Sequence, residues 1–119
     1  MKTDDVDVAQ HADRFAALGH EPRLRIMRLL LAAHPDGLIV GQIQEELGMA
    51  GSTLSHHLDK LKNEGLVTVR RDRQFLWYTA NTKALQELLA FLDAESCTRN
   101  HVIPIKEITQ WKPLSMNKA

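Results

Sequence analysis

Apolar residues recur at helical spacing in several stretches of the chain. The first covers residues 8–18, and the second begins near Pro22. A short stretch covers Val40–Leu47, and the last covers residues 82–97, where leucines stand at i, i+3, i+4 and i+7. Because apolar side chains three and four positions apart share one face of an α-helix, each stretch predicts an amphipathic helix.

One further helical stretch, residues 52–64, differs from the others in its polar content. Leu54, Leu58 and Leu61 form its apolar stripe, and every other position is polar. Ser52 or a close neighbour is expected to cap this helix. Burial of the narrow leucine stripe leaves the rest of the helix surface free to contact a partner.

Beyond the polar helix the pattern changes its period. Residues 66–69 and 75–79 are rich in β-branched and aromatic residues, which predicts the two strands of a hairpin. Arg70, Arg71 and Arg73 lie in the connection, where three positive charges repel one another unless an anion lies close by. A solvated loop tip is the alternative, but the neighbouring polar helix favours anion binding.

The length and composition are those of one folded domain. The chain has 119 residues, of which 44% are hydrophobic and 25% charged. We expect one domain over residues 1–99 and a carboxyl-terminal extension with partial disorder over residues 100–119. Because no stretch approaches the roughly 20 apolar residues of a membrane span, and residues 1–13 are acidic where a signal peptide is basic, we expect a cytoplasmic protein without membrane contact.

A formal net charge of zero conceals a sorting of charge along the chain. Residues 1–13 carry one lysine against four aspartates, whereas residues 52–73 carry five lysines and arginines against three acidic residues. Because a cluster of positive charge attracts a polyanion, the middle of the chain is the expected site of nucleic-acid binding.

The order of these elements predicts a winged helix-turn-helix: mainly α with a small β-hairpin, in the order α-α-α-α-β-β-α. In this arrangement the second helix of the pair enters the major groove of duplex DNA, with its first turns against the base edges. The hairpin then grips an adjacent groove or phosphates. The residues expected to contact DNA are Ser52, Thr53, Ser55, His56, His57, Lys60, Arg70, Arg71 and Arg73.

Two roles are open for His57, because it lies next to the leucine stripe. Its imidazole contacts DNA, or it packs partly buried against a neighbouring helix through a hydrogen bond. His56 is expected to be the more exposed of the pair. Adjacent helical side chains point about 100° apart, so the two histidines are poorly placed to chelate one metal ion together.

Three segments of the chain share a recognisable pattern: residues 17–27 (ALGHEPRLRIM), 52–61 (STLSHHLDKL) and 64–67 (EGLV). They resemble the ArsR/SmtB family of metal- and metalloid-responsive repressors, and the resemblance covers about residues 8–97. It implies a homodimer built on the first and last helices, which occupies a promoter until an effector releases it. Two recognition helices about one DNA turn apart predict a pseudo-palindromic operator.

The resemblance also implies where an effector binds. Relatives that sense arsenic or antimony use cysteines in the short helix or near the end of the last one, and this chain has only Cys97, preceded by Ser96. Trivalent arsenic favours two or three thiolates, so one thiol gives no chelate. Two Cys97 residues meeting across a dimer axis are a candidate As(III) or Sb(III) site or a disulfide, and an inert surface thiol is the alternative. Zinc-sensing relatives use Asp, His and Glu on the last helix; here Asp93 and Glu95 remain, the helix has no histidine, and His101 lies beyond its expected end.

An enzyme and a protein-interaction module are the rival function classes. The chain has no glycine-rich phosphate loop, no HExxH motif and no nucleophile–histidine pair in a plausible setting, so we expect neither catalysis nor a required cofactor. A winged helix that binds another protein, or a family member without a metal effector, stays as the alternative. Steep weakening of binding as salt rises is the property that distinguishes a DNA-binding protein.

Overall fold

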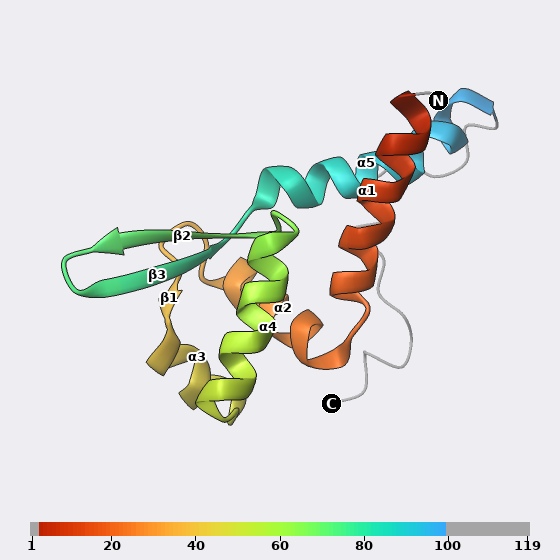
Figure 1. The fold of residues 1–119 in the computed structure, drawn as a ribbon. Coiled ribbons are helices and arrows are strands. Elements are labelled where there is room, and N and C mark those ends of the chain that lie inside the picture. The colour runs from red at the N-terminus through yellow and green to blue at the C-terminus, as the bar shows by residue number, and fades with distance from the viewer. Residues whose placement is uncertain (1–2, 100–119) are drawn as a thin grey trace, which may run out of the picture. The chain divides into compact units, whose positions relative to one another are not determined.

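The structure, a computed structural model, describes the backbone of residues 3–99 and the side chains of residues 7–94. Along that range the elements follow in the order α1-α2-β1-α3-α4-β2-β3-α5, as shown in Figure 1. The helices are α1 (Thr3–Leu18), α2 (Glu21–Ala32), α3 (Val40–Leu47), α4 (Gly51–Asn63) and α5 (Thr82–Arg99), and the strands are β1 (Leu38–Ile39), β2 (Val67–Asp72) and β3 (Phe75–Ala80). The predicted winged helix-turn-helix is confirmed, with one additional strand.

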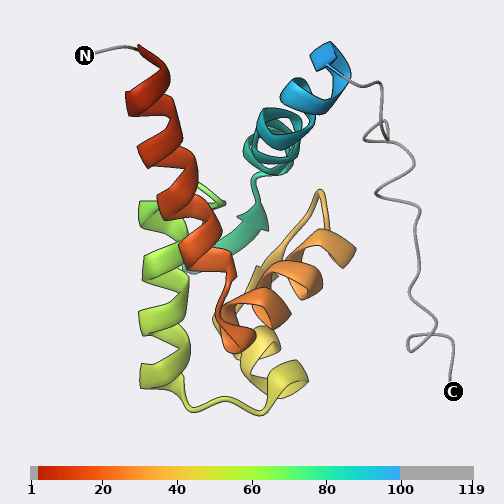
Figure 2. The ribbon, with the colours of Figure 1, turned by 90° about the vertical axis from the view of Figure 1, so that its right-hand side faces the viewer.

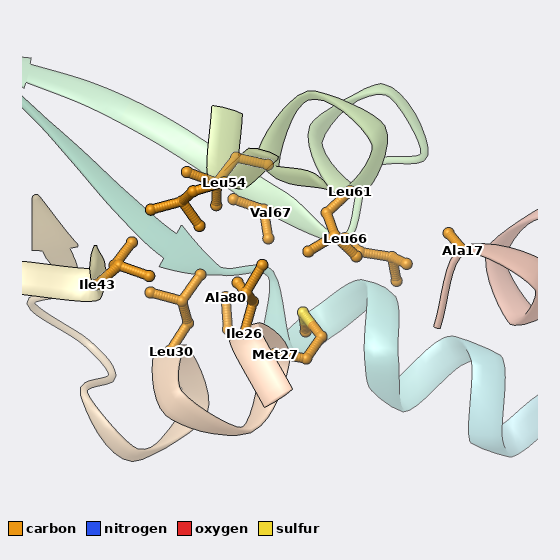
Figure 3. Packing of buried hydrophobic residues seen from close by; sticks show 11 residues of the cluster. Ala17, Ile26, Met27, Leu30, Ile43, Leu54, Leu61, Leu66, Val67 and Ala80 are labelled. Carbon is orange, nitrogen blue, oxygen red and sulfur yellow. The ribbon is translucent and has the colours of Figure 1, made fainter. Parts of the chain in front are cut away.

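The chain divides into two units after Leu85, and the core described here lies in the first. The four helices α1–α4 and the hairpin contribute to that core, and Figure 3 shows their side chains meeting. Its buried members are Ala17, Ile26, Met27, Leu30, Ile43, Leu54, Leu58, Leu61, Leu66, Val67 and Ala80. The predicted leucine stripe of α4 is therefore confirmed as buried. Each such leucine contributes about 1.5 to 3 kcal/mol relative to an exposed one.

The two helices of the helix-turn-helix, α3 and α4, are joined by a short connection that begins with a residue in the left-handed backbone conformation. Gly48, which follows α3, has φ 63° and ψ 35°, and its amide donates to the Gln44 carbonyl. Glycine adopts this conformation without a Cβ penalty, so α3 ends there and the chain turns into α4. At the start of α3, the Ile39 amide donates to Gln42 Oε1 at 3.0 Å.

The strands form an antiparallel sheet in the order β1-β3-β2. The two-residue strand β1 was not predicted, and it pairs Leu38 with Tyr78 and Ile39 with Trp77. Gly37 allows this approach, because its φ is 83° and a Cβ there would collide with the Tyr78 carbonyl oxygen. No local periodicity marks a strand this short.

Several predicted boundaries need correction. The hairpin turn is tighter than expected, because β2 extends through Asp72 and only Arg73 and Gln74 separate it from β3. The expected side-chain cap of α4 is absent: the N-cap residue is Ala50, and Ser52 lies within the first turn. Residues 100–119, the predicted extension, and the Cys97 side chain lie outside the described residues. Among the helices of the described part, none is long and apolar enough to cross a membrane.

Candidate nucleic-acid interface

The α4 helix has a buried face and an exposed polar face. Its buried face consists of Leu54, His57, Leu58 and Leu61. The exposed residues are Ser52, Thr53, Ser55, His56, Asp59, Lys60, Lys62 and Asn63. All the expected DNA-contacting residues of this helix except His57 therefore lie on the exposed face, held there by the leucines beneath.

The first turn of α4 is open to an anionic partner. It contains no acidic residue, and no side chain accepts a hydrogen bond from its amides. The first amides of a helix lack carbonyl partners within the helix and carry the positive end of its dipole. Ser52 and Thr53 place hydroxyl groups in the same turn. These donors suit phosphate oxygens or the acceptor groups on base edges.

His57 packs inside the protein instead of joining the exposed face. Its side chain is only 7% exposed, and its Nδ1 lies 3.3 Å from Nη1 of Arg23. Burial lowers the pKa of the imidazole, and the charge of Arg23 and the neighbouring His20 and His56 lower that pKa further. Of the two roles open for His57, the structure shows packing through a hydrogen bond.

The β2–β3 hairpin extends away from the helices, as Figure 1 shows. Its three arginines are not equivalent. Arg70 donates to the Asp36 carbonyl at 3.1 Å, lies 5.5 Å from the Trp77 ring centre, and approaches Asp72 at 3.9 Å. Within the described part of the chain, the side chains of Arg71 and Arg73 are exposed and form neither a hydrogen bond nor an ion pair. The charge available to an incoming anion therefore resides on these two residues.

Asp59 is a residue of the exposed face whose role sequence reasoning missed. Its carboxylate acts on Tyr78 of β3: burial raises the pKa of the Tyr78 hydroxyl, and the Asp59 charge raises that pKa further. Asp59 is therefore near enough to Tyr78 for its charge to act on that hydroxyl. A carboxylate repels phosphates but accepts from the amino group of cytosine, so it disfavours general backbone contact. In the sequence, the feature that could have pointed to this role was the place of Asp59 among the polar positions of the helix.

A helix-turn-helix family model matches residues 18–70 of the chain, described as "Helix-turn-helix domain". The nodulation protein NolR of Rhizobium meliloti is 32% identical over 91 residues, which cover 76% of this chain and 70% of NolR. The chain belongs to the ArsR/SmtB family of winged helix-turn-helix transcriptional regulators. Within this family assignment, α3 and α4 are the helix-turn-helix and β2–β3 is the wing.

Two other matches agree with the ArsR/SmtB assignment. The transcriptional activator HlyU of Vibrio cholerae is 32% identical over 84 residues, covering 71% of this chain and 75% of HlyU. A homodimeric winged helix-turn-helix DNA-binding domain from Mycobacterium bovis is 27% identical, with a TM-score of 0.64, and the match covers 87% of this chain and 94% of that domain. The chain is thus a DNA-binding transcriptional regulator.

The absence of a metal-ligand cluster holds only for the side chains that the structure describes in one chain. Within residues 7–94, no group of three or more His, Cys, Asp or Glu side chains is placed to hold a metal ion. The side chains of Glu95 and Cys97 lie outside that range. An effector at Cys97 therefore stays a prediction from the sequence.

Proposed function

We propose that the protein is a repressor that binds a pseudo-palindromic operator as a homodimer and leaves it when an effector acts. One observation carries the proposal: a polar helix face with an uncapped first turn belongs to the same fold as a wing with two unpaired arginines. Duplex DNA presents base edges to the polar face of α4 and phosphates to the arginines of the wing. The rival module that binds only protein gives no reason for this pairing.

The exposed residues fall into two groups, one for contacts with bases and one for contacts with the DNA backbone. Ser52, Thr53, Ser55 and His56 supply donors and acceptors on the first turns of α4, where a major-groove helix meets base edges. Lys60 stands farther along, where the DNA backbone passes the helix. The wing arginines supply charge to an adjacent groove or to phosphates. The proposed contacts thus combine base reading with backbone attachment.

Exposed apolar side chains support the homodimer. Val8 on α1 is 52% exposed and Leu92 on α5 is 58% exposed, and each helix would bury such surface in a subunit interface. The Mycobacterium bovis relative is described as homodimeric. A twofold dimer places two α4 helices about one DNA turn apart, so the operator would have two related half-sites.

The proposed effector is a trivalent arsenical or antimonial, or a thiol oxidant, acting on the Cys97 residues of the two protomers. Its support is the position of the lone cysteine late in the last helix. An effector has to bind the DNA-competent and DNA-free forms with different affinity, typically by about 1 to 3 kcal/mol. Arsenite, antimonite, zinc and an oxidant are therefore titrated into the protein–operator complex, with Cys97→Ser as the control. Unchanged release from that variant contradicts the role of the thiol.

A mobility-shift experiment on the promoter of the protein's own gene tests the core of the proposal. We expect binding to the promoter fragment and much weaker binding to a scrambled fragment of equal composition, at one stated salt concentration. A reporter fused to the promoter should become more active when the regulator gene is deleted. Equal affinity for scrambled DNA contradicts operator recognition. A reporter that becomes less active contradicts the repressor role and leaves operator binding unaffected.

A further inference from the structure

The buried face of α4 contains one residue that a hydrophobic core does not require. Leu54, Leu58 and Leu61 fill three of its positions, and His57 fills the fourth. Among the side chains that the structure describes, His57 is the only polar or charged one that is buried. Burying an imidazole costs free energy unless a partner satisfies its polar atoms, so a leucine would serve packing equally well. A specific partner has to justify the histidine.

That partner is Arg23, whose guanidinium joins three helices. Its Nε donates to the Ala17 carbonyl at the end of α1 at 2.7 Å, and its Nη1 lies 3.3 Å from His57 Nδ1 on α4. Figure 2 shows α1 lying alongside α4, with α2 beginning where α1 ends. Because arginine only donates, His57 Nδ1 is the acceptor and its proton resides on Nε2. The interaction therefore requires the neutral imidazole.

The rings of two exposed histidines lie close to the ring of His57. The His20 ring centre is 5.4 Å away and that of His56 is 5.7 Å away. His20 precedes α2, whereas His56 stands on the exposed face of α4. His57 thus lies next to the α1–α2 junction (residues 17–23) and next to a residue that faces the proposed DNA.

We propose that His57 is a positioning residue for DNA binding: with Arg23 it fixes the rotation of α4 about its own axis against the α1–α2 junction. The proposal rests on the proposed function of α4. A leucine stripe tolerates small rotations, because apolar contacts have no preferred direction, whereas a hydrogen bond is directional. Side-chain tips lie about 5 to 6 Å from a helix axis, so a rotation of about 20° moves them by about 2 Å. That displacement is enough to break a hydrogen bond to a base.

The protonation state of His57 gives this role a pH signature. The charged or titratable groups that act on it are Arg23 on α2, His20 before α2 and His56 on α4, while α1 contributes the uncharged Ala17 carbonyl through Arg23. Burial and these groups lower its pKa, so the acceptor form is present at neutral pH. Protonation at lower pH would replace the acceptor with a donor facing a guanidinium. Positioning should therefore fail on acidification.

Substitutions at both ends of the contact test the proposal. Operator affinity is measured by fluorescence anisotropy at pH 7.5 for His57→Leu, His57→Gln, Arg23→Gln and the double variant His57→Leu/Arg23→Gln. We expect about tenfold weaker binding for His57→Leu and at least as much for Arg23→Gln, which also loses the bond to the Ala17 carbonyl. The double variant should bind no more weakly than Arg23→Gln, because both single variants lose the same Arg23–His57 contact. His57→Gln keeps an acceptor and should recover most of the loss.

Matched controls separate positioning from folding and from charge. Arg25→Gln removes the same charge from the same helix at a residue paired with exposed Glu21, and should have a smaller effect than Arg23→Gln. Leu58→Met keeps the volume of the adjacent buried residue and should bind as the wild type does. Circular dichroism melting of each variant verifies that it is folded at the assay temperature.

The pH profile decides the question even if His57→Leu does not fold. Between pH 7 and pH 5, every titratable group other than His57 is common to the wild type and to His57→Gln, so the difference between the two profiles isolates His57. We expect the wild type to lose affinity relative to His57→Gln as pH falls. Parallel profiles, additive losses in the double variant, or wild-type affinity in a folded His57→Leu would overturn the positioning role alone. A wild-type chain that binds no duplex DNA would overturn the proposed function instead.

Discussion

The α4 helix and the β2–β3 wing both present polar residues, but they hold them in different ways. Every exposed side chain of α4 stands on a helix whose opposite face is built into the core through Leu54, Leu58 and Leu61. The wing extends from the core, and its unpaired arginines have no such support. A rigid base suits recognition that depends on distance, whereas mobile charge suits attachment to phosphates. We therefore expect α4 to determine specificity and the wing to determine affinity and its salt dependence.

The largest expected effect comes from weakening the base of α4. Leu58→Ala should lower the free energy of unfolding by about 2 to 5 kcal/mol, because it removes a fully packed side chain and leaves a cavity. Leu76→Ala, at an exposed position of the wing, should change it by about 0.5 kcal/mol or less. Urea unfolding of both variants measures the contrast. Similar losses would show that the wing is as tightly integrated as the helix.

Loss of the wing charges should give the next largest effect. Replacing Arg71 and Arg73 by alanine should reduce the slope of log affinity against log salt by about 1.8, if each arginine neutralises one phosphate. Binding to operator and to scrambled DNA should weaken together, by about tenfold near physiological salt. Arg70→Ala is the internal control, because this side chain already contacts Asp36 and Trp77. A change in the operator-to-scrambled ratio would contradict a purely electrostatic role.

A smaller and more selective effect is expected on α4. His56→Ala should reduce discrimination between operator and scrambled DNA by about 1 kcal/mol or more, with little change in the salt slope, because a base contact carries sequence information and few counterions. Competition binding against both DNA fragments gives the ratio directly. Equal weakening on both fragments would assign His56 to the phosphates and remove the difference between helix and wing.

The smallest expected effect is on the pH dependence of stability. Because the pKa of His57 is lowered in the folded state, the unfolded chain binds more protons below the ordinary histidine pKa of about 6.5. The contribution of His57 to the free energy of unfolding is therefore fully present above that pH, and it is lost as pH falls toward the pKa of His57 in the folded state. The melting temperature should decline more steeply between pH 7 and pH 5 in the wild type than in His57→Gln. A steeper decline in the variant would contradict the direction of the shift.

Local patterns were sufficient to predict most of the fold. The bounds of α3 agree with the prediction, α4 begins one residue before the expected Ser52, and the leucine stripe is buried. Each of these features depends on residues a few positions apart. The winged helix-turn-helix order followed from them.

The parts that were missed depend on distant partners. The strand β1 exists because Gly37 allows the chain to approach β3 closely. Arg70 contacts Asp36, and His57 contacts Arg23, in each case across 34 positions of sequence. No periodicity reports such pairs, so the three wing arginines could not be told apart from the sequence. His56 was expected to be the more exposed histidine, but the choice between the two roles of His57 needed the contact with Arg23.

The lack of a side-chain cap at the amino end of α4 lowers the stability of the helix but leaves its first-turn amides free to bind DNA. Ala50 occupies a position where aspartate would strengthen the free helix by about 1 kcal/mol. The same carboxylate would occupy the amides of the first turn and repel the phosphates that approach them. A thermostabilised Ala50→Asp regulator would therefore be the poorer competitor for its promoter, and in the free natural protein these amides should exchange hydrogen with solvent rapidly until DNA covers them.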